Sequence, residues 1–129
     1  MKVLAIVFAS LFCLGALSPV FAHGDHKPKH GGLMGRGDND DVVVEFVMEK
    51  GAIAVYVEDE AGKPLAIKGV EGTLTLIPPQ RASQDVKLIP SGDGKLTATG
   101  LQPVRGDRLR ARIVLPSGEA LESVSLFSK

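Results

Sequence analysis

Apolar and polar residues alternate along most of the chain after residue 41, with the two-residue period of half-buried β-strands. Glu45 and Glu49 mark the polar face of the first run, and a turn at Lys50-Gly51 leads into a second run. We therefore predict a β-hairpin at the centre of the core. Its apolar face consists of Val42, Val44, Phe46, Met48, Ile53, Val55 and Val57.

The rest of the chain carries further strand signals separated by glycine and proline. A β-branched run over residues 73–77 stops at Pro78-Pro79, where missing N–H donors prevent further pairing. Alternating runs around glycine-containing turns predict two more hairpins, over residues 86–98 and 108–127. About seven to eight short strands without a helical period predict an all-β fold, an antiparallel β-sandwich that is immunoglobulin-like or related. A small closed barrel is the alternative architecture.

The first residues have the composition of a secretory signal. A positive start at Met1-Lys2 precedes a largely apolar run over Val3–Leu17, and small residues lead to a cleavage site after Ala22. The run is shorter than the roughly 20 residues that span a bilayer, so we predict a cleaved signal peptide over residues 1–22 and no stable membrane insertion afterwards. The one cysteine, Cys13, would leave with the signal.

Residues 23–41 contain few large apolar side chains and are predicted to form a flexible tail ahead of a domain over residues 42–129. This tail holds all three histidines of the chain. Imidazole nitrogen and carboxylate oxygen suit copper(II), zinc or nickel, and cleavage after Ala22 would add the α-amine of the first histidine, which favours copper. The candidate ligands are His23, Asp25, His26 and His30.

A soluble spacer is the alternative interpretation of this tail, because each residue that a metal fixes costs roughly 1–2 kcal/mol of chain entropy. Met34 is a further candidate for copper(I), since its thioether sulfur is soft. Met48 is assigned to the core, because it lies on the apolar face of the first strand. Tyr56 faces away from the core and serves either a surface contact or sheet packing.

The charged residues indicate neither nucleic-acid binding nor catalysis. The formal net charge is zero, which argues against a nucleic-acid partner. The arginines of 108–112 form the outer face of a strand, with Glu119 and Glu122 as neutralising partners. A hydrolytic triad would need a histidine in the folded part, and the acids of Glu58-Asp59-Glu60 occupy an exposed turn. We predict that the protein is not an enzyme.

Several segments resemble a group of small, largely uncharacterised periplasmic proteins of proteobacteria, often encoded beside copper, silver or cobalt-zinc-cadmium efflux systems. The segments are His30-Gly31-Gly32, Glu45-Phe46-Val47, 53–59, Gly62-Lys63-Pro64, 72–76 and 94–98. The resemblance implies a periplasmic auxiliary of heavy-metal resistance with His30 as the best-matching ligand. Members often carry a histidine where this chain has Glu60, so a second metal site on the domain is not implied.

Two hypotheses of function follow. The first is a periplasmic metal-binding protein that takes copper, or else zinc or nickel, through its tail and docks on a component of an efflux system. The second is a metal-independent interaction domain whose sheet edge or arginine face binds another envelope protein. Replacing the histidines would abolish the first function and spare the second.

Overall fold

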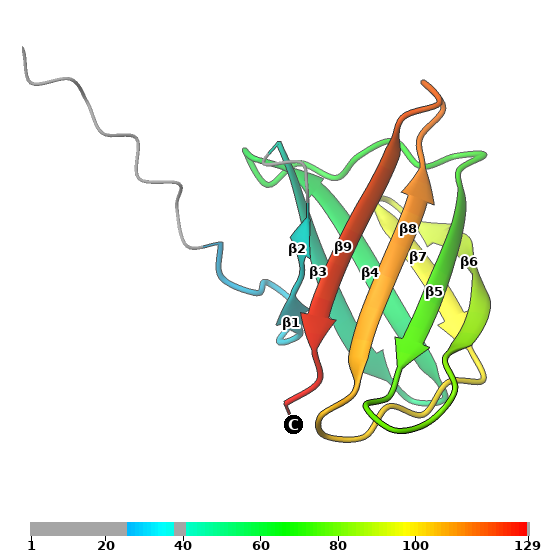
Figure 1. Ribbon diagram of the computed structural model, residues 1–129. Helices are drawn as coiled ribbons and strands as arrows, with labels where there is room; N and C mark the ends of the chain where they lie inside the picture. Colours follow the sequence, from blue (N-terminus) through cyan, green and yellow to red (C-terminus); the bar gives the residue numbers. More distant parts are fainter. Residues whose placement is uncertain (1–25, 38–40, 129) are drawn as a thin grey trace, which may run out of the picture.

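The computed structural model of the chain describes residues 26–37 and 41–128. Within these ranges it contains antiparallel β-strands and no helix (Figure 1). The strands are β1 (Leu33–Met34), β2 (Arg36–Gly37), β3 (Val42–Glu49), β4 (Ala52–Asp59), β5 (Glu71–Ile77), β6 (Gln84–Gly92), β7 (Lys95–Thr99), β8 (Arg108–Val114) and β9 (Ala120–Leu126). The signal peptide predicted for residues 1–22, and the predicted ligands His23 and Asp25, lie outside the described residues.

The strands form one nine-stranded sheet in the order β1-β3-β4-β7-β6-β5-β8-β9-β2. The sheet turns a corner at β6, whose first half pairs with β5 and whose second half pairs with β7, with an irregularity between Pro90 and Gly92. A strand that changes partners at such an irregularity bends the sheet and lets it fold back on itself. The all-β antiparallel prediction is confirmed, whereas a sandwich of two separate sheets with seven to eight strands is not.

The residues Leu33–Gly37 make the second corner and nearly close the sheet into a barrel. β1 pairs with β3 and β2 pairs with β9, so this short run joins the two ends of the sheet (Figure 1). The prediction that residues 23–41 form a flexible tail is wrong for Leu33–Gly37, and the folded unit begins before Val42. The glycine-rich composition that suggested disorder instead permits close approach to both edge strands.

The core lies between the facing halves of the curled sheet. The three predicted hairpins are confirmed as β3–β4, β6–β7 and β8–β9, and the predicted inward residues of the first hairpin, apart from Met48, line this core or pack against it. Burial of this apolar surface is the main favourable contribution to folding. Side chains with at most 1% exposure include Phe46, Ile53, Val55, Val57, Leu74, Leu88, Leu96, Leu109, Ala111 and Ile113.

Met48 does not belong to the core, and its assignment to the core is wrong. It is 37% exposed although it shares the face of Val44 and Phe46. The pairing of β1 with β3 reaches only as far as Phe46. Beyond that residue no described strand flanks β3 on that side, so the side chain of Met48 is left at the open edge.

No helix among the described residues is long and apolar enough to span a membrane.

Gly35, between β1 and β2, is expected to tolerate no side chain. An added Cβ would overlap the Ser123 hydroxyl and lie 2.9 Å from the Phe46 ring. Overpacking of this kind costs about 1–3 kcal/mol, so Gly35→Ala is expected to lower the urea midpoint accordingly. Gly92→Ala is the control, because its Cβ would meet its nearest neighbour at 3.7 Å. Equal midpoints for the two variants would contradict the tight closure at Gly35.

Candidate functional site

A buried carboxylate on the outer face of the sheet is the centre of the candidate site. Glu45 lies on β3 between the inward-facing Val44 and Phe46, and alternation directs it outward as predicted. It is nevertheless only 5% exposed. The strand register places Met34 on one side of it and Tyr56 on the other. The covering that buries it comes from residues 26–32, hereafter the N-terminal arm.

The N-terminal arm is bound to Glu45 through its backbone. The carboxylate accepts hydrogen bonds from the N–H groups of Lys29 at 3.2 Å, His30 at 2.9 Å and Gly32 at 2.9 Å. Bonds from N–H donors to a charged acceptor are stronger than neutral ones. They satisfy the donors of a segment without regular structure and offset the desolvation of the carboxylate.

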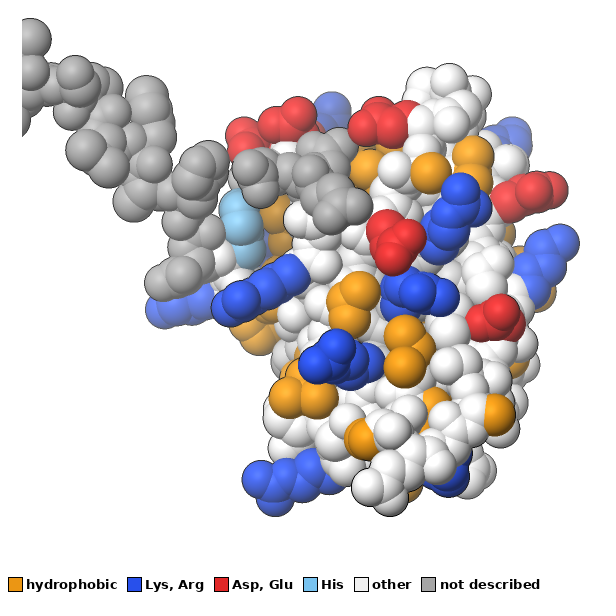
Figure 2. Space-filling view, viewed as in Figure 1, with side chains coloured by type: hydrophobic (Ala, Val, Ile, Leu, Met, Phe, Trp, Pro, Cys, Tyr) orange, Lys and Arg blue, Asp and Glu red, His pale blue; other side chains and the backbone are white. Residues whose placement is uncertain are grey.

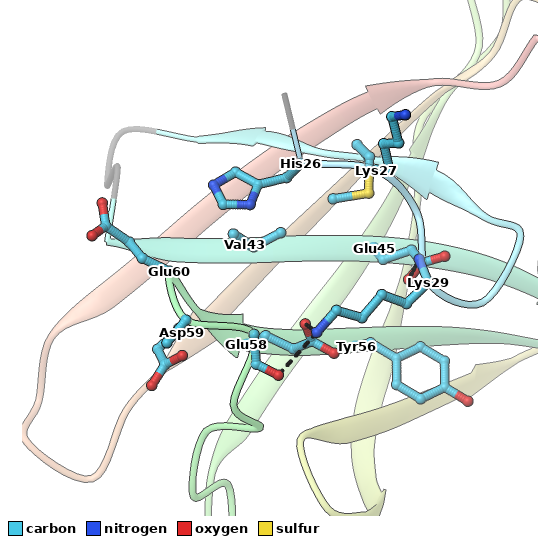
Figure 3. A pocket seen from close by; sticks show the side chains of 12 residues that line it. His26, Lys27, Lys29, Val43, Glu45, Tyr56, Glu58, Asp59 and Glu60 are labelled. Carbon is cyan, nitrogen blue, oxygen red and sulfur yellow. Dashed lines mark hydrogen bonds and ion pairs between the residues drawn. The ribbon is translucent and has the colours of Figure 1, made fainter. Parts of the chain in front are cut away.

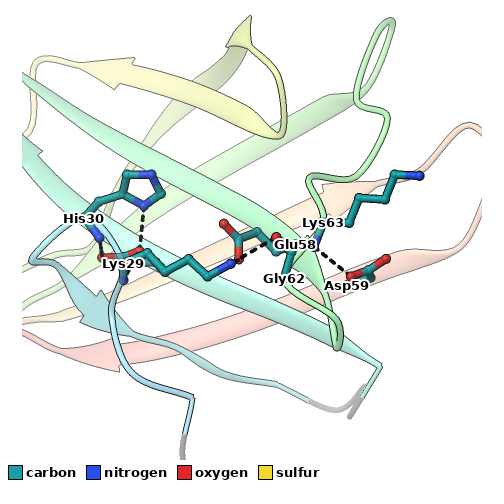
Figure 4. A network of polar contacts seen from close by, with 7 residues as sticks. Lys29, His30, Glu58, Asp59, Gly62 and Lys63 are labelled. Atoms are coloured by element: carbon teal, nitrogen blue, oxygen red, sulfur yellow. Dashed lines mark hydrogen bonds and ion pairs between the residues drawn. The ribbon is translucent and has the colours of Figure 1, made fainter.

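The imidazole of His30 makes the fourth contact with the same carboxylate. Its Nδ1 lies 2.8 Å from Oε2 of Glu45 (Figure 4). The ring is also stacked on Tyr56, with centroids 3.7 Å apart and planes inclined by 7°. The side chain remains 36% exposed. Two independent contacts therefore fix the orientation of a ring that is still open to solvent.

The protonation of Glu45 determines which nitrogen of His30 is available. Burial raises the pKa of Glu45, but the hydrogen bonds from the His30 ring and from the Gly32 and His30 amides, together with the charge of His30, lower it below its ordinary value of 4.5. At neutral pH the carboxylate is ionised and can only accept. Nδ1 of His30 must then carry the proton, and in the neutral ring Nε2 presents its lone pair away from Glu45.

Lys29 fastens the N-terminal arm at a second point. Its Nζ lies 2.8 Å from Oε2 of Glu58 on β4 and donates to the carbonyl oxygen of Gly62 at 3.0 Å (Figure 4). An ion pair with one exposed member contributes little to stability on its own. Here it orients the arm across β3 and β4, above the loop that follows β4.

A cavity of about 160 Å³ lies between the N-terminal arm and strands β3 and β4. Figure 3 shows His26 on the arm side and the acidic residues at the end of β4 on the other. Four carboxylates and two lysines line it, so its charge favours a cation. The lining residues used below are His26, Met34, Glu58, Asp59 and Glu60.

Comparison with protein-family models, curated proteins and solved structures finds no match to this chain.

The structure places two of the four predicted metal ligands. His30 is held by Glu45, while His26 is exposed and lines the cavity. Within residues 26–37 and 41–128, no cluster of three or more histidine, cysteine, aspartate or glutamate side chains is arranged to hold a metal. A metal site would therefore have to combine His30, His26 or both with ligands outside the described ranges or of another chemical type.

Sequence reasoning missed Glu45 and Tyr56 as partners of His30. Both were assigned correctly to the outer face, but alternation says nothing about which segment covers a face. A glutamate between Val44 and Phe46 is ordinary for a half-buried strand, so only the tertiary position of the N-terminal arm reveals its role. The two glycines that follow His30 were the one sequence signal that this segment could approach another strand closely.

The predicted arginine face is an ordinary charged sheet surface. Figure 2 shows acidic and basic side chains interspersed over β5, β8 and β9. Arg110 lies 3.9 Å from Glu122, one of its predicted neutralising partners. No patch of a single charge on this face points to a polyanionic partner.

The contact between the N-terminal arm and Glu45 is expected to weaken in acid. Because the folded pKa of Glu45 lies below its unfolded value, the unfolded chain binds the proton first as the pH falls. The stabilisation is complete above about pH 4.5 and is lost as the pH falls through the folded pKa. The difference in urea midpoint between wild type and Glu45→Gln should therefore be largest at neutral pH and should shrink below about pH 4.5. A difference independent of pH would contradict the assignment.

Proposed function

We propose that this protein is a non-enzymatic, periplasmic metal-binding auxiliary of a heavy-metal resistance or efflux system. Copper is the preferred ion, with zinc or nickel as alternatives. The ligands are His30 and His26, together with His23 and Asp25 from the preceding residues. Export depends on the predicted signal peptide over residues 1–22, and the link to efflux rests on the resemblance of the strand and turn segments.

The contact between His30 and Glu45 carries this proposal. Histidines that bind metals usually donate their second ring N–H to a carboxylate or carbonyl, which fixes the tautomer and raises the basicity of the ligating nitrogen. Nδ1 of His30 makes this contact with Glu45 at 2.8 Å, and Nε2 is left for a ligand. Stacking on Tyr56 restricts the ring further.

Ordering of His30 also reduces the entropic objection to a metal-binding tail. A chain that must fix every ligand on binding loses roughly 1–2 kcal/mol per residue. The backbone around His30 is already held by Glu45, and Lys29 is paired with Glu58. The chain entropy of these residues is therefore already lost before a metal binds.

Calorimetric titration of the chain beginning at His23 with copper(II), zinc and nickel tests the proposal. His30→Asn is the most informative variant, because its side-chain amide can still donate to Glu45 but lacks a nitrogen at the Nε2 position. We expect submicromolar copper binding in wild type, near −8 kcal/mol or better, and at least tenfold weaker binding in the variant.

Unchanged stability of His30→Asn in urea would show that the N-terminal arm remains in place. Wild-type binding no tighter than about millimolar, near −4 kcal/mol, would reject the metal-binding function. The metal-independent interaction domain would then be the remaining hypothesis.

A further inference from the structure

Met34 is placed where a soft metal ligand would be accessible. In the pairing of β1 with β3, Leu33 stands opposite Phe46 and Met34 stands opposite Glu45. Leu33 therefore packs against the core, whereas Met34 points to the outer face and is half-buried. Core packing, the usual role of a methionine in a strand, does not account for this position.

Met34 lines the same cavity as His26. His26 is exposed and makes no hydrogen bond or ion pair with the described residues, which leaves its ring nitrogens available. A methionine and a histidine whose ring has no partner among the described residues thus line the same small space between the N-terminal arm and the sheet.

The acidic wall of the cavity gives this space its charge. Glu58 is paired with Lys29, and Asp59 accepts a hydrogen bond from the Lys63 amide at 2.8 Å. Glu60 completes the wall and forms no ion pair with residues of the described ranges. Together the carboxylates outnumber the lysines of the cavity, which favours a bound cation over an anion or a neutral ligand.

We infer that this cavity binds a monovalent soft metal ion, copper(I), through the sulfur of Met34 and a ring nitrogen of His26. Thioether sulfur selects copper(I) over zinc, nickel and the hard divalent ions, whereas imidazole accepts copper in either oxidation state. The site differs from the His30 position, because its defining ligand is a methionine. The inference rests on the proposed metal-binding function and adds an ion and a ligand to it.

Competition between the protein and a chromophoric copper(I) chelator, under reducing conditions and without oxygen, tests this inference. Met34→Leu keeps the size and apolar character of the side chain but removes the sulfur. We expect at least tenfold weaker copper(I) binding in this variant and in His26→Ala. Met48→Leu is the matched control, because Met48 is also partly exposed but does not line the cavity, and its affinity should equal that of wild type.

The same variants separate this inference from the proposed function. Zinc binding that depends on His30 should be unaffected by Met34→Leu, since zinc does not select a thioether. Copper(I) affinity of Met34→Leu within twofold of wild type overturns the Met34 site, whatever the zinc titration shows. Loss of zinc binding in His30→Asn supports the function independently of that result.

Silver(I) provides a second readout, which reports where the ion binds instead of how tightly it binds. It is a soft monovalent ion like copper(I) and does not change oxidation state during the titration. In a sample with isotope-labelled methionine methyl groups, one equivalent of silver(I) should shift the Met34 methyl resonance and leave that of Met48 in place. A shift at Met48 alone, or at neither of the two, contradicts the assignment.

Discussion

Replacement of Glu45 by glutamine is expected to weaken both the fold and metal binding. A glutamine offers one carbonyl oxygen to four donors, and its own NH2 group would face them. Leaving such donors unsatisfied should lower the free energy of unfolding by about 1.5–3 kcal/mol. Loss of the group that orients a metal-binding histidine should weaken binding by about 10- to 100-fold. Urea unfolding and calorimetric titration measure the two effects on the same samples.

Glu49→Gln is the matched control for this substitution. Glu49 lies on the same strand and outer face, but its partner is the side chain of Lys95 at 2.9 Å, and it is more exposed. An exposed ion pair adds little to stability, so the urea midpoint should change only slightly, and metal binding should not change. Equal effects of the two substitutions would mean that Glu45 has no special relation to His30.

Shortening the chain so that it begins at Val42 is expected to open the sheet. The change removes β1 and β2, uncovers edges of β3 and β9, and exposes Glu45. Loss of the packing of Leu33 and of the bonds to Glu45 should cost about 3 kcal/mol or more. Uncovered edge strands pair readily with other chains, so light scattering should also detect association.

A chain beginning at His26 is the control for this shortening. It keeps the N-terminal arm and both closing strands, so its urea midpoint should match that of a chain beginning at His23. If the chain beginning at Val42 were equally stable and monomeric, the pairing of Leu33–Gly37 with both edges would contribute nothing. The chain beginning at Val42 is a poor control for metal binding, because it lacks strands β1 and β2 as well as the histidines.

Features encoded by neighbouring residues were predictable from the sequence. The hairpins β3–β4, β6–β7 and β8–β9 follow from alternation and from the turns between their strands. Each pairs residues that are close in the sequence, so the turn itself determines the pairing. The inward positions of Ile53 and Leu109 follow from the same period.

Features that depend on distant parts of the chain were not predictable in this way. Arg36 pairs with Val124, and no local pattern in a short glycine-rich run announces such a partner. Burial of Glu45 depends on the N-terminal arm, and exposure of Met48 depends on where β1 ends. The candidate site is built from such contacts, which explains why His30 was identified while its partners were not.

The most direct test of the central claim is to follow the two ring nitrogens of His30 by nitrogen-15 NMR during a zinc titration. If Glu45 holds Nδ1–H while the metal binds the other nitrogen, the Nε2 resonance should shift on binding and Nδ1 should keep its proton. The same titration of Glu45→Gln should show a weaker response. A zinc-dependent shift at Nδ1, or none at either nitrogen, would contradict the claim that His30 is an oriented metal ligand.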